Sequence, residues 1–229
     1  MYHIDKLEAC TVHNIRLIQI FEDEWKLNKE LTKKRLQQIL GVSKAVRLHA
    51  RNCKIREIDV PTSSSFSQKY HSQGSCGTKK RMGAFHNNEL VAVMTFSLGN
   101  VTRGSQPTEG IWELSRFCSN YDYHIPGIAS KLLTFFKKNY KWSQIFSYAD
   151  RRWSIGNLYK QLGFVLDTKK IFPSYWYIEG SRRIHRSSGR KRPNEPKDIT
   201  EAKLRAQEGR IRLWDCGHLK FVINNLDVK

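Results

Sequence analysis

Gln144-Ile-Phe-Ser-Tyr-Ala-Asp150 is the stretch that decides the fold, together with Asn157-Leu-Tyr-Lys-Gln-Leu-Gly-Phe164, which soon follows it. The first is an apolar run of strand length and predicts a buried strand. The second predicts a short helix at 157–162 that ends at a glycine. A buried strand followed closely by a helix is typical of an α/β sheet.

Further elements are expected on both sides of this stretch. They are a hairpin of strands at 82–85 and 90–97, a strand at 110–118, a helix at 127–138 and a strand at 175–178. Antiparallel strands followed by strand–helix–strand–helix–strand predict an α/β (α+β mixed) fold, with a central mixed sheet flanked by helices.

The flanks differ in composition from this centre, so we expect three segments: 1–60, 61–180 and 181–229. The first contains an expected strand at 15–21, a helix at 26–40 and a strand region at 47–60. A polar loop at 61–68 marks the first boundary. The last segment is a basic extension with a helix-prone run at 199–208.

The charge balance is the strongest compositional signal. In 229 residues, 40 Lys and Arg stand against 21 Asp and Glu, for a net charge of +19. Such self-repulsion favours a polyanionic partner, with DNA as the first candidate. At 39% hydrophobic and 11% aromatic residues, the chain can still form a packed core.

A membrane or secreted protein is not expected. The sequence has no apolar run long enough to span a bilayer and no N-terminal signal-peptide pattern. Its five cysteines include no C-x-x-C pair, which argues against a disulfide framework or a zinc ribbon and suits a reducing, cytoplasmic location. No metal is predicted.

Two clusters of basic residues are candidates for phosphate contacts. One lies on the expected helix at 26–40, where the alternative is a solvated helix face. The other is expected to form an arm, with a disordered tail as the alternative. The arm residues are Arg182, Arg183, Arg186, Arg190, Lys191 and Arg192.

The turn His124-Ile-Pro-Gly-Ile-Ala-Ser130 joins an expected strand to an expected helix. Small residues allow close backbone approach, and free N–H groups at a helix start favour phosphate. Many such turns bind nothing, so this signal is weak alone.

Together with 157–164, this turn resembles the GNAT acyltransferase superfamily over about residues 66–180. The resemblance implies that Gly127, Ala129, Ser130 and Asn157 bind acetyl-CoA or another acyl-CoA. It also implies that Tyr159 is the general acid for the departing thiolate, since a phenol stays protonated at neutral pH. The alternative for Tyr159 is an amphipathic core residue.

Three further segments resemble the phage Mom-type branch, whose members act on an adenine amino group in DNA. They are Tyr70-His-Ser-Gln-Gly74, Glu113-Leu-Ser-Arg116 and Ala149-Asp150. By this resemblance Asp150 and Tyr159 are catalytic, and Tyr70, His71 and Arg116 lie near the acceptor. Arg151 and Arg152 are expected to contact DNA, although with Asp150 they can equally form a local ion pair.

The flanks resemble the C-terminal half of phage homing-endonuclease-like proteins. The matching words are Ile15-Arg-Leu-Ile-Gln-Ile-Phe-Glu-Asp-Glu-Trp25, Tyr148-Ala-Asp-Arg-Arg-Trp-Ser154 and Asp215-Cys-Gly217. No acidic metal-site word precedes Ile15, so we expect residues 1–60 to be the remnant of a nuclease-like module. Glu22, Asp23 and Glu24 are better explained as carboxylates at a helix start than as metal ligands.

These observations predict a phage-type, DNA-binding GNAT-like acyltransferase that acylates an amino group of a DNA base and so protects DNA from host nucleases. The target base would be flipped out or single-stranded. Two alternatives stay open. One is an inactive DNA-binding module related to homing endonucleases, working beside a nuclease, and the other is an acetyltransferase that acts on a host defence protein.

Overall fold

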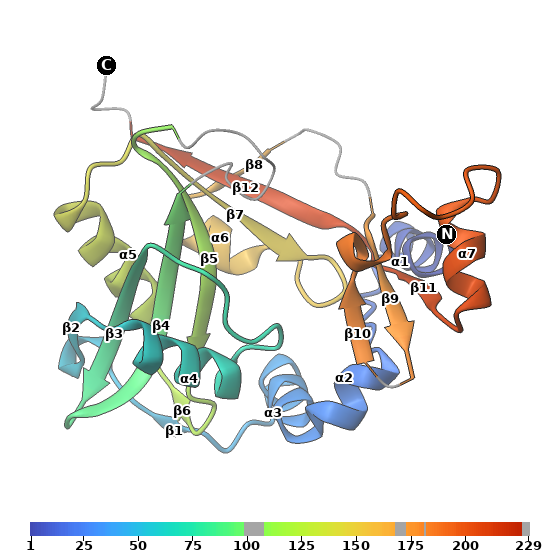
Figure 1. Ribbon diagram of the computed structural model, residues 1–229. Coiled ribbons are helices and arrows are strands. Elements are labelled where there is room, and N and C mark those ends of the chain that lie inside the picture. The colour runs from blue at the N-terminus through green and yellow to red at the C-terminus, as the bar shows by residue number, and fades with distance from the viewer. Residues whose placement is uncertain (99–107, 168–172, 181, 226–229) are drawn as a thin grey trace. The chain divides into compact units, whose positions relative to one another are not determined.

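The computed structural model describes residues 1–98, 108–167, 173–180 and 182–225 (Figure 1). Two compact units are interleaved along the chain. Unit 1 comprises Met1–Leu27, Ala149–Ile155 and Lys169–Leu219, and unit 2 comprises Asn28–Tyr148, Gly156–Thr168 and Lys220–Lys229. Two strands, at 144–150 and 218–224, have residues in both units.

Unit 2 is built on a seven-stranded sheet of order β2-β3-β4-β5-β7-β12-β8. Its strands are β2 (Lys54–Glu57), β3 (Lys80–His86), β4 (Glu89–Leu98), β5 (Ile111–Ser119), β7 (Gln144–Asp150), β8 (Val165–Leu166) and β12 (His218–Asn224). β2 to β5 are antiparallel neighbours, whereas β5 and β7 are parallel. The expected central mixed sheet and its hairpin are therefore confirmed.

Helices accompany this sheet. They are α3 (Lys29–Ile39), α4 (Val60–Tyr70), α5 (Ile128–Asn139) and α6 (Asn157–Gln161), with the 3-10 turn η1 (Ala50–Asn52). α5 buries its apolar face, and its Phe136 ring stacks on Phe96 of β4 with centroids 3.7 Å apart. A short parallel pair, β1 (Val46–Arg47) with β6 (Tyr123–His124), precedes α5.

Unit 1 contains a three-stranded antiparallel sheet of order β10-β9-β11. Its elements are α1 (Tyr2–Val12), α2 (Glu22–Leu27), β9 (Tyr175–Glu179), β10 (Arg182–His185), η3 (Arg186–Gly189), α7 (Glu201–Gln207) and β11 (Ile211–Trp214). The aromatic β9 lies between the two other strands, and Tyr177 at its centre is fully buried.

Two expected elements of the N-terminal region are wrong. Residues 15–21 form no strand; they are irregular, and the Phe21 ring packs against the guanidinium of Arg152. The expected polar loop at 61–68 is part of α4. Asp59 caps this helix by accepting from the Thr62 N–H at 2.8 Å, and Pro61 fits the first turn, where a helix needs no N–H donor.

Part of the arm expected at 182–192 is regular secondary structure. Residues 182–185 form β10, which pairs with β9, and Arg183 forms an ion pair with Asp23 at 2.7 Å. The arginine-rich run has few apolar residues of its own. It is held by the aromatic strand β9 and by the Asp23 carboxylate. Beyond this region, β12 completes the central sheet of unit 2 instead of continuing a tail.

No helix within the described ranges is long and apolar enough to cross a membrane. The described residues also contain no group of three or more His, Cys, Asp or Glu side chains arranged to hold a metal ion.

Candidate active site

The candidate site lies where the parallel strands β5 and β7 part. They share only three registered pairs, from Ile111 opposite Gln144 to Glu113 opposite Phe146. β5 nevertheless continues to Ser119 and β7 to Asp150, and Figure 1 shows the two strands separating from a common start. Beyond the last pair, their facing backbone groups are not used to pair the two strands, and such an open edge can accept an extended ligand that carries amides.

A β-bulge sits next to this point. Between β4 and β5 the register changes from Thr95 opposite Arg116 to Phe96 opposite Leu114, so that Ser115 is the extra residue. Bulges bend a strand and re-aim its side chains, and they are common beside active sites. The bulge therefore contributes to the divergence of β5.

The hydroxyl of Tyr159, on α6, lies at the parting of the strands. Its Oη is 2.9 Å from Ser147 Oγ and donates to the Tyr148 carbonyl oxygen at 3.3 Å. Ser147 Oγ also lies 2.7 Å from the Leu114 carbonyl oxygen of β5, and its single proton is shared between that oxygen and Tyr159 Oη. A serine and a tyrosine thus link β7 to β5 immediately after the last strand pair.

Aromatic packing fixes the Tyr159 ring. The ring stacks on Phe221 of β12, with centroids 5.1 Å apart, and meets Phe164 edge-on at 5.8 Å. Gly156, before α6, has φ +82°, and a Cβ atom there would come within 2.0 Å of the Phe221 ring. Only glycine fits this position, so the stack depends on it.

Burial raises the pKa of Tyr159, although the Ser147 hydrogen bond and the charge of Arg116 act in the opposite direction. The phenol therefore stays protonated at neutral pH. A neutral phenol held by short contacts can donate to a developing anion, as general-acid chemistry requires.

The turn before α5 has the backbone that its sequence predicts. Gly127 has φ +82°, and a Cβ atom there would be in ordinary van der Waals contact with Ala50, at 3.8 Å. Ser130 is exposed, whereas the methyl group of Ala129 is buried, so Ala129 can offer a ligand only its N–H. The first-turn amides of a helix have no partner within it and favour phosphate.

Lys131 in the same turn is held by backbone carbonyl oxygens. Its Nζ donates to the carbonyl oxygens of Ala50 at 2.9 Å and Cys53 at 2.6 Å, which ties η1 to α5. Asn157 begins α6 and is exposed. The residues of the turn fit a phosphate-bearing ligand mainly through the backbone.

Tyr70 and His71 end α4 in the same unit as Tyr159. The Tyr70 ring packs on Phe66, with centroids 4.5 Å apart. Burial, with the charges of Arg116 and Arg35, lowers the pKa of His71 to about 3. His71 is therefore neutral at physiological pH and a poor proton acceptor, and its Nδ1 accepts from the Gln73 N–H at 3.1 Å.

Arg116 interacts both with the segment that follows α4 and with Tyr159. Its Nε donates to the Gly74 carbonyl oxygen at 3.1 Å, and its charge acts on both His71 and Tyr159. The structure thus brings His71, Arg116 and Tyr159 into one electrostatic neighbourhood of unit 2.

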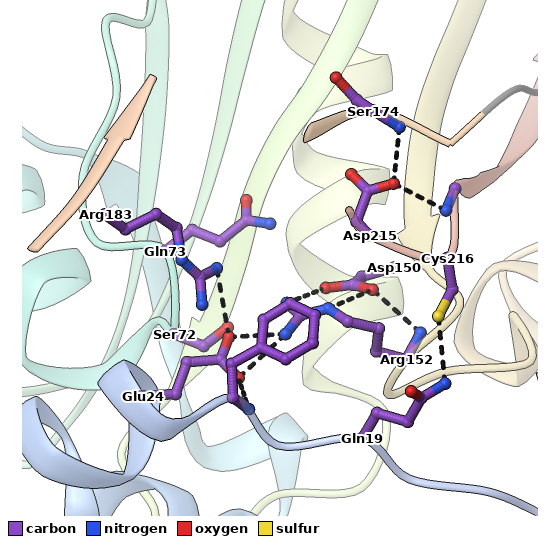
Figure 2. A network of polar contacts seen from close by, with 12 residues as sticks. Gln19, Glu24, Ser72, Gln73, Asp150, Arg152, Ser174, Arg183, Asp215 and Cys216 are labelled. Carbon is purple, nitrogen blue, oxygen red and sulfur yellow. Dashed lines mark hydrogen bonds and ion pairs between the residues drawn. The ribbon is translucent and has the colours of Figure 1, made fainter. Parts of the chain in front are cut away.

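Asp150 belongs to unit 1, where Figure 2 shows it within a polar network. Arg152 pairs with Asp150 at 2.6 Å and with Glu24 at 2.9 Å, and the Arg152 side chain is only 4% exposed. Burial alone would raise the pKa of Asp150, but the charge and hydrogen bonds of Arg152 lower it overall. This geometry favours the local ion pair among the two interpretations of Asp150.

The remaining predicted DNA-binding residues divide by exposure. Arg151 contacts the Cys216 carbonyl oxygen at 3.2 Å, and Lys191 donates to the Ile199 carbonyl oxygen at 2.7 Å. Arg183 pairs with Asp23, as described above. Four arginines are exposed and form no ion pair within the described residues: Arg182, Arg186, Arg190 and Arg192.

Sequence reasoning missed Ser147, which links both strands to Tyr159. It also missed Thr95 and Arg81, which lie in one row with Arg116 across the sheet. Ser147 lies inside the expected strand at 144–150, and only its place beside the last strand pair marks it out. That signal depends on strand register, which the sequence does not display.

No family model matches this chain, and no curated protein does. Several solved acetyltransferase structures share part of its form. The PaiA N-acetyltransferase of Thermoplasma acidophilum, in complex with coenzyme A, is 21% identical over 39% of this chain and 54% of its own, with a TM-score of 0.32. The match thus spans about half of that enzyme's length.

Two others match over nearly their whole length. A Bacillus subtilis acetyltransferase in complex with CoA is 10% identical over 76% of this chain and 99% of its own, with a TM-score of 0.43. A GNAT family acetyltransferase of Elizabethkingia anophelis with acetyl-CoA bound is 13% identical over 76% and 99%, with a TM-score of 0.42. At these identities, function has to follow from the residues of this chain.

Proposed function

We propose that this protein transfers an acyl group from acyl-coenzyme A to an amino group of a DNA base. The observation that carries the proposal is the Tyr159 hydroxyl, held between β5 and β7 where their pairing stops. The open strand edges suit the amide-containing arm of coenzyme A, and the Gly127 turn suits its phosphates.

A bound thioester would supply an activated acyl carbon, whose C–S bond breaks as a C–N bond to the acceptor forms. Tyr159 would hold its proton at Oη and deliver it to the departing sulfur, while the acceptor nitrogen loses a proton to solvent. An exocyclic amino group of a base is uncharged at neutral pH, so it needs no deprotonation before it attacks. This suits a site in which His71 is a poor base.

DNA as the acceptor is supported by the net charge of +19 and by the exposed arginines of unit 1. Phosphate contacts release counterions, so DNA affinity should fall with salt by about 0.9 log units per contact per decade. Replacing Arg186 and Arg190 by Gln should reduce this slope by about 2. Lys141→Gln, at an exposed residue already paired with Glu109, is the matched control.

The direct test incubates the full chain with acetyl-CoA and either single-stranded or duplex DNA, followed by mass spectrometry of the digested nucleosides. We expect an acylated nucleoside, and a loss of about 100-fold or more in Tyr159→Phe. Tyr140→Phe, at a ring that packs on Phe136, controls for losing any phenol.

A second candidate is a DNA-binding module without acyl transfer, favoured by the same exposed arginines. It predicts salt-dependent DNA binding that Tyr159→Phe leaves unchanged and no modified nucleoside under any condition. These two results together would overturn the proposed acyl transfer in favour of the DNA-binding module.

A further inference from the structure

A small pocket in unit 2 lies beneath α4 and has a volume of about 150 Å³. Most of the residues around it are serine, threonine or arginine. Residues from α4, the following loop and three strands form its wall: Val60, Ser63, Ser64, Ser67, Ser75, Cys76, Gly77, Thr78, Arg81, Thr95 and Arg116. Apart from Arg116, none of these residues belongs to the candidate active site described above.

Strand register brings three of these residues into one row. Arg81 of β3 is opposite Thr95 of β4, and Thr95 is opposite Arg116 of β5. Residues that face each other across strands share one side of the sheet, so the threonine lies between two arginines. The row ends at the bulge at Ser115.

Two polar groups of this row are buried and have no hydrogen-bond partner among the residues that the structure describes. They are Oγ1 of Thr95, a residue only 2% exposed, and Nε of Arg81. Buried donors are nearly always satisfied, so each one needs an explanation, such as a ligand that completes the site. Both residues line the pocket.

The charges in the row point to a negatively charged ligand. Arg81 donates to the Thr78 carbonyl oxygen at 2.5 Å, and Arg116 donates to backbone oxygens. Neither arginine forms an ion pair with a carboxylate in the described part of the chain. Two carboxylates lie near enough to interact electrostatically with residues of the pocket. Asp59 interacts with Arg81, and Glu113 interacts with Cys76.

We propose that this pocket binds an oxyanion group, a carboxylate or a phosphate, between Arg81 and Arg116, with Thr95 donating its hydroxyl. Guanidinium groups bind both anions through paired N–H donors, and a hydroxyl adds a third. Binding of the anion requires no acyl transfer, so the two proposals stand or fall separately.

Thermal unfolding of the full chain tests the site. At constant ionic strength set with sodium chloride, inorganic phosphate or acetate should raise the melting temperature, and the stronger of the two identifies the ligand. Thr95→Val keeps the shape of the side chain but removes the unpartnered hydroxyl. It should therefore melt at or above the temperature of the wild type without ligand, and it should lose most of the ligand-induced rise.

Cys76, exposed in the pocket wall, provides a local readout. Its rate of reaction with the anion iodoacetate, divided by that with neutral iodoacetamide, should fall about fivefold in Arg116→Gln. Phosphate or acetate should slow the iodoacetate reaction in the wild type. Arg56→Gln, on the exposed face of β2, changes the same charge outside the pocket and should leave the ratio unchanged.

Equal responses in Arg116→Gln and Arg56→Gln would mean general electrostatics and overturn the proposal. So would phosphate and acetate effects no larger than that of chloride, or a Thr95→Val variant that keeps the full ligand-induced rise. Each result is independent of whether any nucleoside is acylated.

Discussion

The guanidinium of Arg152 donates two hydrogen bonds to the carboxylate of Asp150, at 2.6 Å from Nη2 and 3.2 Å from Nε. The same guanidinium binds both carboxylate oxygens of Glu24, at 2.9 and 3.0 Å. One arginine thus joins the helix start at 22–24 to the end of β7 within unit 1 (Figure 2). The arrangement gives a structural role to two segments of the sequence, the acidic residues at 22–24 and the run Asp-Arg-Arg at 150–152.

Asp150→Asn should mainly lower stability. The amide keeps the shape but leaves Arg152, which is 4% exposed, without one of its two counter-charges. Losing one partner of a buried ion pair typically costs about 3–5 kcal/mol. The measurement is urea unfolding, with Glu109→Gln as the control, because Glu109 forms an exposed pair with Lys141 and should change stability by less than about 1 kcal/mol.

If Asp150→Asn unfolds at the wild-type urea concentration but no longer acylates DNA, then Asp150 is a catalytic residue and the structural role fails. A joint loss of stability and activity that low temperature restores would support the ion pair.

The pH dependence of stability should carry a signature of His71. Its pKa is lowered to about 3 in the folded chain, against 6.5 ordinarily, because burial and two arginines disfavour the charged ring. Below pH 6.5 the unfolded chain therefore takes up a proton that the folded chain does not. This contribution is complete above pH 6.5 and is lost progressively as the pH falls toward 3.

His71→Asn, which keeps an acceptor for the Gln73 N–H, should flatten the curve of unfolding free energy against pH across this interval. Exposed His13→Asn is the control and should leave the slope as it is. A variant curve parallel to that of the wild type would show that His71 titrates normally in the folded chain.

The sequence was sufficient for much of unit 2, because its signals there are local. The hairpin at 80–98 follows a nearly continuous apolar run at 90–96 and the turn residues Asn87-Asn88, both of which have positive φ. Tyr159 could be found because the residues that carry the family resemblance around it, at 157–164, are contiguous in the sequence.

Failures occurred where distant contacts decide the structure. The serine-rich run at 61–68 lacks strong helix formers, yet it is a helix whose Phe66 packs in the core with Val93 of β4 and Cys118 of β5. The row of Arg81, Thr95 and Arg116 depends on the register of three strands and on a bulge. No periodicity within any one strand shows which residues will be opposite each other.

Gly156→Ala should be far more damaging than an ordinary glycine substitution. Its φ of +82° costs a side chain about 1–2 kcal/mol, and its Cβ atom would overlap the Phe221 ring. Moving this ring also disturbs the stack under Tyr159. We expect a total loss of at least about 3 kcal/mol in chemical unfolding, together with lower acyl transfer.

Gly41→Ala isolates the backbone contribution, because Gly41 has φ +72° and a Cβ atom there would meet no other atom within 4 Å. Similar losses in the two variants would show that the Phe221 ring moves aside easily, and that the stack does not depend on Gly156.

Ser147→Ala tests the link between strand geometry and chemistry. The change leaves the Leu114 carbonyl oxygen without this donor and removes the partner of Tyr159 Oη, at a residue only 2% exposed, so stability should fall by about 1–3 kcal/mol. The Ser147 hydrogen bond lowers the pKa of Tyr159, so its loss should raise that pKa further. The absorbance of the phenolate, as a difference against Tyr159→Phe, measures the shift.

Because a weaker acid donates less readily to the departing sulfur, Ser147→Ala should slow acyl transfer by about tenfold, less than Tyr159→Phe. Ser97→Ala, which removes a 2.7 Å contact with Ser115 on neighbouring strands, is the matched control and should affect stability but not the titration of Tyr159. If Ser147→Ala leaves this titration unchanged and acyl transfer still falls tenfold, then Ser147 acts by holding β5 and β7 at their parting rather than by tuning the phenol.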